Sequence, residues 1–425
     1  MPVVKASPWV KRNEVTDKKL MSEHTIRGGR NVKHSNSILK GVRVLDISSI
    51  LAAPLATNLL GDFGAEVIKI ELPNKGDATR HWDSYLWKVT NRNKKCITLD
   101  FHKRKAKEIF YKLVEKSDIV VTNFRPETLK KWSIDYEDIV KVKSDIVMLH
   151  FSAFGRTGEL TNHPGFARVA EGYSGLMYMT GNPDEKPMPS GYAIADGLGG
   201  VYAAFSIMLA FYHYKQTGEG QLVDLSLYEP MFRIMEDFVI DYDVKGRIKE
   251  RVGTYNPALA PNDLYKTKDN RWIILPASTD NMYKRLMKAM EKEELIDDPR
   301  FNSNDNRVKN REELDNYLNE FFLANSYNDL EKLLTQYKVA FGPVNTIRDI
   351  VEDSHYLSRD NLLRVYDEKL ERNVTVQGIV PKMSKTPGEV KWLGPDLGEH
   401  NEEVYKNLLS LTDETLADLE NNDII

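Results

Sequence analysis

Residues 42–71 have the sequence VRVLDISSILAAPLATNLLGDFGAEVIKIE. The apolar run 42–47 predicts a β-strand. Pro54 suits the first position of a helix, whose apolar residues keep a helical spacing until Gly64 ends it. A second strand, Glu66–Glu71, follows directly. Strands separated by a helix of this length predict parallel pairing, and therefore an α/β domain.

The same alternation continues along the chain. It predicts strands over 96–101, 118–123 and 146–151, a helix over 103–116, and a later strand over 222–227. The stretch Gly197–Tyr214 contains no Asp, Glu, Lys or Arg, and its length is near that of a membrane span. Its glycines, its serine, its histidine and its polar flanks instead favour a buried core helix.

Differences in composition predict five segments. Residues 1–38 carry eight Lys or Arg and three Asp or Glu without the apolar stretch of a secretory signal, which predicts a flexible tail. Residues 248–345 are richer in charge and predict a second, smaller domain. The expected division is a flexible tail 1–38, a large α/β domain 39–230, a linker 231–247, a small domain 248–345, and a linker with a returning C-terminal part over 346–425.

Composition also excludes several classes of function. The net charge of −4 over 425 residues argues against a general nucleic-acid-binding protein. The single cysteine, Cys96, excludes an internal disulfide, and no Cys/His spacing indicates a metal site. We expect a reducing, cytoplasmic location, with Cys96 buried in a strand. The turn 46–54 has no glycine-rich dinucleotide motif, and no phosphate loop supports a nucleotide-dependent ligase.

Short segments spread from residue 39 onward form an ordered set. They are LKGVRVLD (39–46), GAEVIKIE (64–71), GD (76–77) with Arg80, NRNKK (91–95), NFRP (123–126), GYAIADGLGG (191–200), TGEGQLVDLSL (217–227), GPV (342–344) and LGEH (397–400). In this order they resemble the family III CoA-transferases, the group that includes formyl-CoA transferase, carnitine CoA-transferase and α-methylacyl-CoA racemase.

The resemblance implies a Rossmann-like large domain built from both chain ends and a smaller α+β domain. It also implies an obligate homodimer in which two ring-shaped chains interlock, with the active site between the large domain of one chain and the small domain of the other. The implied ligands are an acyl-CoA and a carboxylic acid. No permanently bound cofactor, metal, nucleic acid or membrane is implied.

Asp196 matches the nucleophile of the family. Without the resemblance, an Asp ahead of a small-residue helix is usually a helix N-cap, and the two roles are compatible because a helix N-terminus stabilises a carboxylate. A nucleophilic Asp196 would pass CoA between two acids through a mixed anhydride and an aspartyl-CoA thioester. Backbone N–H groups near Gly197 and in the turn 51–53 are the expected oxyanion donors. Members of the family with a glutamine in that turn use its amide, whereas this chain has Leu51.

The resemblance also assigns residues to substrate. CoA is expected to contact Leu51, Ala52, Leu99, Asp100, Phe101, His102, Asn123, Phe124, Arg125, Lys131, Phe166 and Ala167. Lys131 falls where the family often has a basic residue near phosphate. Glu171, one helical turn after Ala167, is expected to line the acyl pocket with Gly197. The alternatives are exposed side chains for Lys131 and His102, core packing for Phe124, and a structural or surface role for Glu171.

The choice between transferase and racemase depends on residues 166–167. Racemases of the family have a His-Asp dipeptide there, which supplies half of their acid/base pair. This chain has Phe166-Ala167, and neither residue can carry a proton. These two residues therefore favour a CoA-transferase. The resemblance to the family implies dicarboxylates with succinyl-CoA as donor, or an intramolecular CoA shift. A 2-methylacyl-CoA racemase and a non-catalytic CoA-binding protein stay as alternatives.

Overall fold

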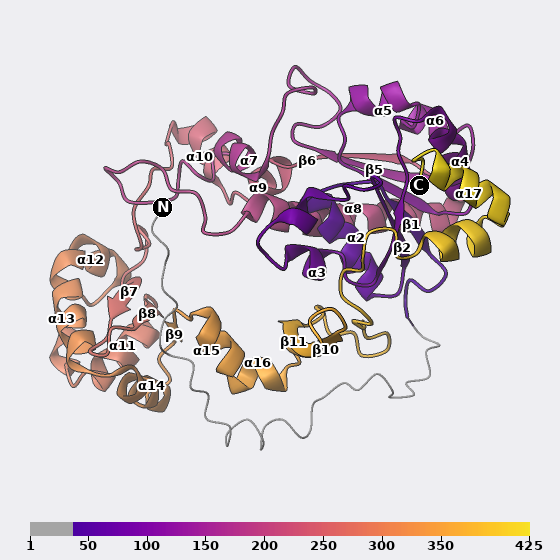
Figure 1. Cartoon of the computed structure of the whole chain (residues 1–425). Helices are drawn as coiled ribbons and strands as arrows, with labels where there is room; N and C mark the ends of the chain where they lie inside the picture. The colour runs from indigo at the N-terminus through magenta and orange to yellow at the C-terminus, as the bar shows by residue number, and fades with distance from the viewer. Residues whose placement is uncertain (1–36) are drawn as a thin grey trace, which may run out of the picture. The chain divides into compact units, whose positions relative to one another are not determined.

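The computed structural model describes residues 37–425 and divides them into two compact units (Figure 1). Within these residues, unit 1 comprises 37–163, 196–226 and 354–425, and unit 2 comprises 164–195 and 227–353. Unit 1 thus contains both ends of the described chain. Residues 164–195, which we expected in the large domain, group with unit 2 instead. The tail predicted for 1–38 lies outside the described residues, apart from its last two.

A six-stranded parallel sheet forms the centre of unit 1, as predicted for an α/β protein. Its strands are β1 (Arg43–Asp46), β2 (Glu66–Glu71), β3 (Lys94–Thr98), β4 (Ile119–Thr122), β5 (Val147–Ser152) and β6 (Leu222–Ser226). They follow the order β3-β2-β1-β4-β5-β6, so the direction of winding reverses between β1 and β4. In open α/β sheets, ligands bind at the carboxyl ends of the strands at such a reversal.

Helices cover both faces of this sheet (Figure 1). They are α2 (Ala52–Asp62), α3 (Leu86–Thr90), α4 (Arg104–Glu115), α5 (Pro126–Trp132), α6 (Tyr136–Ile139), α8 (Ile194–Thr217) and α17 (Asp413–Asn421). Because side chains alternate along a strand, Leu45, Ile68 and Ile97 share one face and form a core with α4 and α17. The neighbouring positions point to the opposite face, which α2 and α8 cover.

The C-terminal segment returns to the sheet beside β3. A π-helix (Glu403–Leu408) places the buried Tyr405 so that its hydroxyl donates to the carbonyl of Thr98 over 2.6 Å. The Asp100 N–H donates to the carbonyl of Ile424 over 2.8 Å. Unit 1 also holds α16 (Ser354–Ser358), the antiparallel hairpin of β10 (Leu362–Asp367) and β11 (Arg372–Gln377), and a 3₁₀ turn, Ala78–His81.

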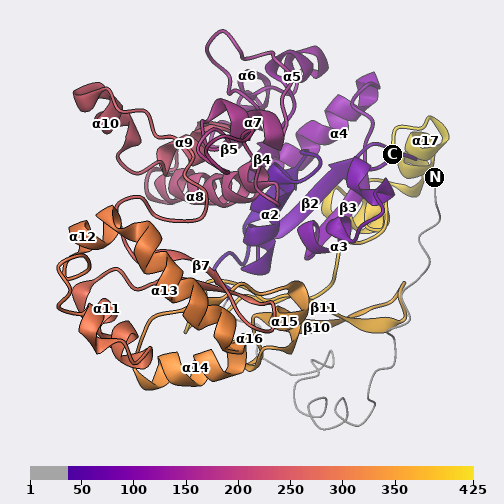
Figure 2. The same ribbon diagram turned by 90° about the vertical axis from the view of Figure 1, so that its left-hand side faces the viewer.

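Unit 2 has a core of its own around a three-stranded antiparallel sheet (Figure 2). The strands are β7 (Asn262–Lys266), β8 (Trp272–Pro276) and β9 (Gly342–Pro343). The helices are α7 (Ala167–Tyr173), α9 (Glu229–Arg233), α10 (Phe238–Lys245), α11 (Asp280–Ala289), α12 (Asn304–Lys309), α13 (Arg311–Ala324), α14 (Tyr327–Gln336) and α15 (Ile347–Glu352), with a 3₁₀ turn, Glu293–Leu295. The predicted linker 231–247 therefore contains most of α9 and all of α10.

Close packing of α8 on β5 and on α2 depends on two glycines. A Cβ at Gly199 would lie 2.6 Å from Cζ of Phe151, and one at Gly200 would lie 2.8 Å from the carbonyl oxygen of Ala52. Both distances are shorter than a Cβ tolerates, so only glycine allows this approach. Gly199 and Gly200 therefore let α8 pack closely on β5 and on α2.

The helix α8 is buried on only one side, which differs from the core helix that we predicted. Ala203 and Ile207 are fully buried, whereas Val201, Phe205, Leu209 and Tyr212 are 52% to 63% exposed. By length and composition α8 is apolar enough to cross a membrane, and 39% of its most apolar window is buried. Because the four exposed residues share one helical face, they form an apolar stripe on unit 1.

Replacing Gly200 by alanine is expected to destabilise the protein by about 1–3 kcal/mol, because the added methyl group must push α8 away from the Ala52 carbonyl. Gly172→Ala is the matched control, since Gly172 is also helical and its Cβ would meet no atom within 4 Å. The control is expected to be neutral or stabilising by about 0.5–1 kcal/mol. Thermal unfolding followed by circular dichroism measures both; equal effects would contradict the packing described above.

Candidate active site

Asp196 lies in the first turn of α8 and is half-buried. The helix begins two residues before Asp196, so this residue is inside the helix and not the cap that the sequence alone suggested. Gly200, four residues later, is the point where α8 meets Ala52. One helical turn, about 6 Å along the axis, therefore separates Asp196 from the contact with the start of α2.

The turn between β1 and α2 lies at the reversal point of the sheet. Residue 51 precedes α2, and no side chain caps the helix there. Asn123, which follows β4, exchanges two hydrogen bonds with Ser49: its amide oxygen accepts from the Ser49 N–H over 2.9 Å, and its amide group donates to the Ser49 carbonyl over 2.8 Å. These bonds join the ends of β1 and β4, so the predicted CoA residues Leu51, Ala52 and Asn123 belong to one edge of the sheet.

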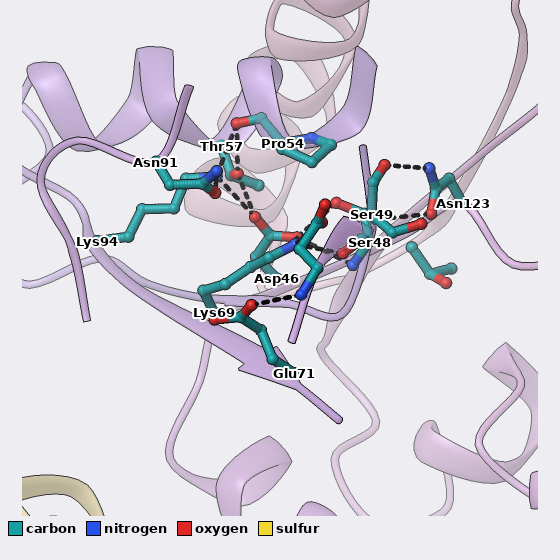
Figure 3. A network of polar contacts seen from close by, with 12 residues as sticks. Asp46, Ser48, Ser49, Pro54, Thr57, Lys69, Glu71, Asn91, Lys94 and Asn123 are labelled. Carbon is teal, nitrogen blue, oxygen red and sulfur yellow. Dashed lines mark hydrogen bonds and ion pairs between the residues drawn. The ribbon is translucent and has the colours of Figure 1, made fainter. Parts of the chain in front are cut away.

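A fully buried cluster of charges lies beneath this turn (Figure 3). Asp46 ends β1, and its carboxylate lies 2.9 Å from Nζ of Lys94 and 3.7 Å from Nζ of Lys69. Ser48 donates to the same carboxylate through its N–H and its hydroxyl, and Thr57 of α2 donates over 2.7 Å. The ammonium group of Lys69 also donates to the Ser48 carbonyl. The cluster thus joins three strands, the turn and α2.

The charges of this cluster shift one another's pKa values. Burial raises the pKa of Asp46, but Lys69, Lys94 and the hydrogen bond from Ser48 more than offset this, so the net shift is downward. Burial lowers the pKa of Lys69, yet Asp46 and Asp77 raise it above its usual value. The pKa of Lys94 shifts in the opposite direction. Burial and repulsion from Lys69 both lower it, and attraction to Asp46 does not bring it back to its usual value. The two lysines differ because Lys69 faces two carboxylates.

Four predicted CoA residues meet around Trp132, which the sequence reasoning missed. Phe101 stacks on Trp132 with ring centroids 5.4 Å apart, and His102 and Phe124 approach it edge-on at 5.4 Å and 4.9 Å. Lys131 precedes Trp132 in the last turn of α5 and is exposed. Segments from three parts of the chain therefore converge at the carboxyl edge of the sheet. A tryptophan on a charged, short helix gave no periodic signal that would have revealed this.

The remaining predicted residues of unit 1 differ in their exposure. The Leu99 side chain is buried in the core, so only its backbone is available to a ligand. Asp100 accepts a hydrogen bond from the His102 N–H over 2.9 Å and lies 2.7 Å from the His102 ring. Arg125 is exposed, and its guanidinium contacts the Asn162 carbonyl at 3.4 Å. His102 and Arg125 therefore present polar groups at the surface.

Three predicted residues lie in unit 2. Phe166 precedes α7 and is 67% exposed, and Ala167 begins the helix. Glu171 is buried, and both of its oxygens lie 3.0 Å from Nη1 of Arg168. It also accepts a hydrogen bond from the Ser190 N–H over 3.2 Å. These contacts give Glu171 a structural function. That it also lines an acyl pocket stays a prediction.

A second missed residue, His150, supports the segment after β4. It is fully buried on β5, and its Nε2 lies 2.8 Å from the carbonyl oxygen of Phe124. Its Nδ1 faces Asp224 of β6 at 3.9 Å, and that carboxylate accepts a hydrogen bond from the Arg156 N–H over 3.0 Å.

Among residues 37–425, no group of three or more His, Cys, Asp or Glu side chains is arranged to hold a metal ion.

Comparison with known proteins identifies the family. The model described as CoA-transferase family III matches residues 39–401. The chain is 36% identical, over 394 residues, to the succinyl-CoA–D-citramalate CoA-transferase of Chloroflexus aurantiacus, which covers 91% of this chain and 98% of that protein. It is 30% identical, over 400 residues, to the succinyl-CoA:glutarate CoA-transferase of Homo sapiens. That alignment covers 92% of this chain and 91% of the human protein.

A solved structure supports the same assignment. The crystal structure of a CAIB/BAIF family protein from Brucella suis aligns with a TM-score of 0.80 at 29% identity, and covers 88% of this chain and 100% of that one. This chain therefore belongs to CoA-transferase family III. The family resemblance and the transferase class predicted from the sequence are both confirmed.

Replacing Asp46 by asparagine is expected to destabilise the protein by about 3–5 kcal/mol at pH 7, because two buried ammonium groups lose their shared carboxylate. The pKa of Asp46 is lower in the folded than in the unfolded chain, so its stabilising effect is present above pH about 4 and is lost as the pH falls further. The difference between wild type and variant should therefore shrink below pH about 4.

Urea unfolding at pH 7 and at pH 3.5 measures this difference. Asp138→Asn serves as the control, since Asp138 is partly exposed and pairs with the exposed Lys141 at 3.7 Å. Its effect should stay within about 1 kcal/mol at both pH values. A constant difference between wild type and Asp46→Asn across the two pH values would contradict the charge assignment.

Proposed function

We propose that this enzyme transfers CoA from succinyl-CoA, or from the CoA thioester of another dicarboxylic acid, to a carboxylic acid acceptor, with Asp196 as nucleophile. The observation that carries the proposal is the position of Asp196, one helical turn from the contact between α8 and the uncapped start of α2. Membership of CoA-transferase family III supports the same reaction.

The first half of the proposed reaction loads CoA onto the enzyme. The Asp196 carboxylate attacks the thioester carbonyl of the donor, and the CoA thiolate leaves, which gives a mixed anhydride between Asp196 and the donor acid. The thiolate then attacks the Asp196 carbonyl, and the donor carboxylate leaves. The product is an aspartyl-CoA thioester, and no water enters the balance.

The second half repeats these steps in reverse. The acceptor carboxylate attacks the aspartyl thioester, and CoA thiolate leaves as a second mixed anhydride forms. The thiolate attacks the acyl carbonyl of the acceptor, which releases the new CoA thioester and regenerates the Asp196 carboxylate. Covalent catalysis of this kind conserves the thioester energy, because each acyl bond that breaks is replaced by another.

Backbone N–H groups supply the proposed oxyanion stabilisation. The donors are the N–H groups of residues 51–53, at the N-terminus of α2, together with that of Gly197. The CoA moiety would extend along the carboxyl edge of the sheet, past Asn123 and toward the aromatic cluster around Trp132. His102, Arg125 and Lys131 would offer polar and basic groups to its phosphates.

The relatives support a dicarboxylate as substrate. The names of the two proteins compared above both specify succinyl-CoA, with D-citramalate in one and glutarate in the other. A 2-methylacyl-CoA racemase is the alternative, and the residues at 166–167 argue against it because neither side chain can transfer a proton. Rapid washout of α-deuterium from a 2-methylacyl-CoA would favour the racemase.

We also propose that the enzyme is a cytoplasmic homodimer of interlocked chains that binds neither membrane nor nucleic acid. The apolar stripe of α8, Val201, Phe205, Leu209 and Tyr212, supports a protein partner, because contiguous exposed apolar residues usually mark an interface. The opposite face of the same helix is buried, with Ala203 and Ile207 fully inaccessible, and α8 packs on β5 and α2, which argues against a membrane span. The net charge of −4 argues against nucleic acid.

A panel of carboxylic acid acceptors with succinyl-CoA as donor tests the activity, with new CoA thioesters identified by mass spectrometry. Wild type is expected to form a new thioester with at least one dicarboxylate. Asp196→Asn should lower the rate by a factor of about a thousand or more, because no carboxylate remains to attack. Asp184→Asn, at an exposed loop position, is the control and should retain the full rate. Full activity of Asp196→Asn would overturn the mechanism.

Light scattering after size-exclusion chromatography tests the dimer. Wild type should have twice the 48.8 kDa mass of one chain. Joint replacement of Phe205 and Leu209 by lysine should prevent assembly, because two charges would be buried in the interface. The control Glu219→Lys reverses a charge in the exposed turn after α8 and should leave the mass of the assembly unchanged. A monomeric wild-type protein would contradict the proposal.

A further inference from the structure

The backbone before α2 is bound by side chains at each of residues 48–50. The N–H of Ser48 donates to Asp46, and that of Ser49 donates to Asn123. The N–H of Ile50 donates to Oδ2 of Asp77 over 2.9 Å. The next N–H groups, those of residues 51–53, begin an 11-residue helix that no side chain caps. The turn is thus fixed immediately ahead of the donors that the proposed function uses.

Ile50 has an unusual backbone conformation. Its φ of +70° lies in the left-handed region, which a β-branched side chain disfavours strongly. Such a conformation is unfavourable and persists only where surrounding contacts enforce it. The Ile50 N–H has one acceptor, the Asp77 carboxylate, so Asp77 is the contact that acts directly on this residue.

Asp77 is itself held firmly. It is 5% exposed, and its Oδ1 accepts from the N–H and the hydroxyl of Thr79 over 2.9 Å and 2.8 Å. Its N–H donates to Oε1 of Glu71, whose two oxygens also bind Arg80. Its Oδ2 lies 3.6 Å from Nζ of Lys69, which in turn contacts Asp46. The Asp77 carboxylate therefore has little freedom to move.

We propose that Asp77 is a positioning residue, which holds Ile50 in the left-handed conformation and thereby directs the N–H groups at the start of α2 toward the CoA thioester. This inference rests on the proposed function, because it assumes that CoA binds at this turn. It goes beyond that function in assigning the geometry of the turn to a residue 27 positions further along the chain. The Gly76-Asp77 segment with Arg80 then has a physical explanation: these residues carry the support for the turn.

A purely structural function of Asp77 makes a different prediction. If Asp77 stabilised only the fold, its removal would affect CoA binding equally whatever residue occupied position 50. If it holds a strained residue in place, its removal should matter less once the strain is absent. Glycine adopts a φ of +70° without cost, so Ile50→Gly removes the strain.

The experiment is a double-mutant cycle of Asp77→Ala and Ile50→Gly, in which CoA binding is read by isothermal titration of succinyl-CoA into proteins that also carry Asp196→Asn, well below the unfolding temperature. Succinyl-CoA carries the thioester carbonyl that free CoA lacks, and Asp196→Asn prevents its transfer. Asp77→Ala is expected to weaken CoA binding about tenfold in the Ile50 background. In the Ile50→Gly background the same change should weaken it less than about threefold. If Asp77→Ala does not fold, the isosteric Asp77→Asn takes its place in both backgrounds, with a smaller difference of the same sign.

Asp62→Ala is the matched control. Asp62 is also a buried carboxylate, and it binds Arg92 at the opposite end of α2. Its loss should lower the unfolding temperature but leave the affinity for CoA unchanged. Equal losses of affinity from Asp77→Ala in the two backgrounds, or no loss in either, would overturn the positioning function. Failure of the wild-type protein to bind CoA would instead contradict the proposed function.

Discussion

The buried carboxylate of Asp46, paired with Lys69 and Lys94, is the interaction on which unit 1 depends. Three charges lie without access to solvent on the α2 face of the sheet. Charges in such a place are tolerated only if each has a partner in good geometry, because loss of one leaves another unpaired in a medium of low dielectric. Asp46 and Lys94 are 48 residues apart, so their contact fixes the relative positions of β1 and β3.

The same cluster connects the fold to the chemistry. Lys69 bonds to the Ser48 carbonyl and faces Asp77, while Thr57 reaches Asp46 from α2. The turn that carries the proposed oxyanion donors is therefore attached to the most buried charges of the domain. Rigid attachment of this kind suits donors that must be in position before charge develops, since no reorganisation is then needed during the reaction. The glycine contact at Gly200 brings the helix of Asp196 to the same place.

The sequence predicted the architecture of unit 1 well, because period-two and helical patterns are local. The strand Glu66–Glu71 was predicted to the residue. The strand expected at 96–101 instead occupies Lys94–Thr98, because its first residue is a charged side chain that is buried by a partner far along the chain. The linker expected at 231–247 is largely helical, and the exposed side of α8 was not foreseen. Neither the helices of the linker nor the exposed face of α8 has a pattern of polar and apolar residues that would have predicted it.

The site was predicted through the family resemblance far more than through local pattern. Asp196 and Asn123 were named before their surroundings were known, and the structure places each at the carboxyl edge of the sheet or beside it. Trp132 and Ile50 could not be found in this way. The ring contacts of Trp132 come from two other segments, residues 101–102 and residue 124, and nothing in the sequence favours a positive φ at an isoleucine. The periodicity of a sequence reports local structure, so it cannot predict contacts between distant segments or the backbone strain that such contacts enforce.

The state of Cys96 has a practical consequence. It was predicted to be buried in a strand, and it lies fully buried in β3, where desolvation raises the pKa of its thiol well above the usual range. Thiol reagents act on accessible thiolates, so the native protein should be inert toward them. Labels can therefore be attached to introduced cysteines without first removing Cys96. One cysteine introduced on the surface of each unit would suffice to attach a pair of fluorophores and to measure the distance between the units in solution.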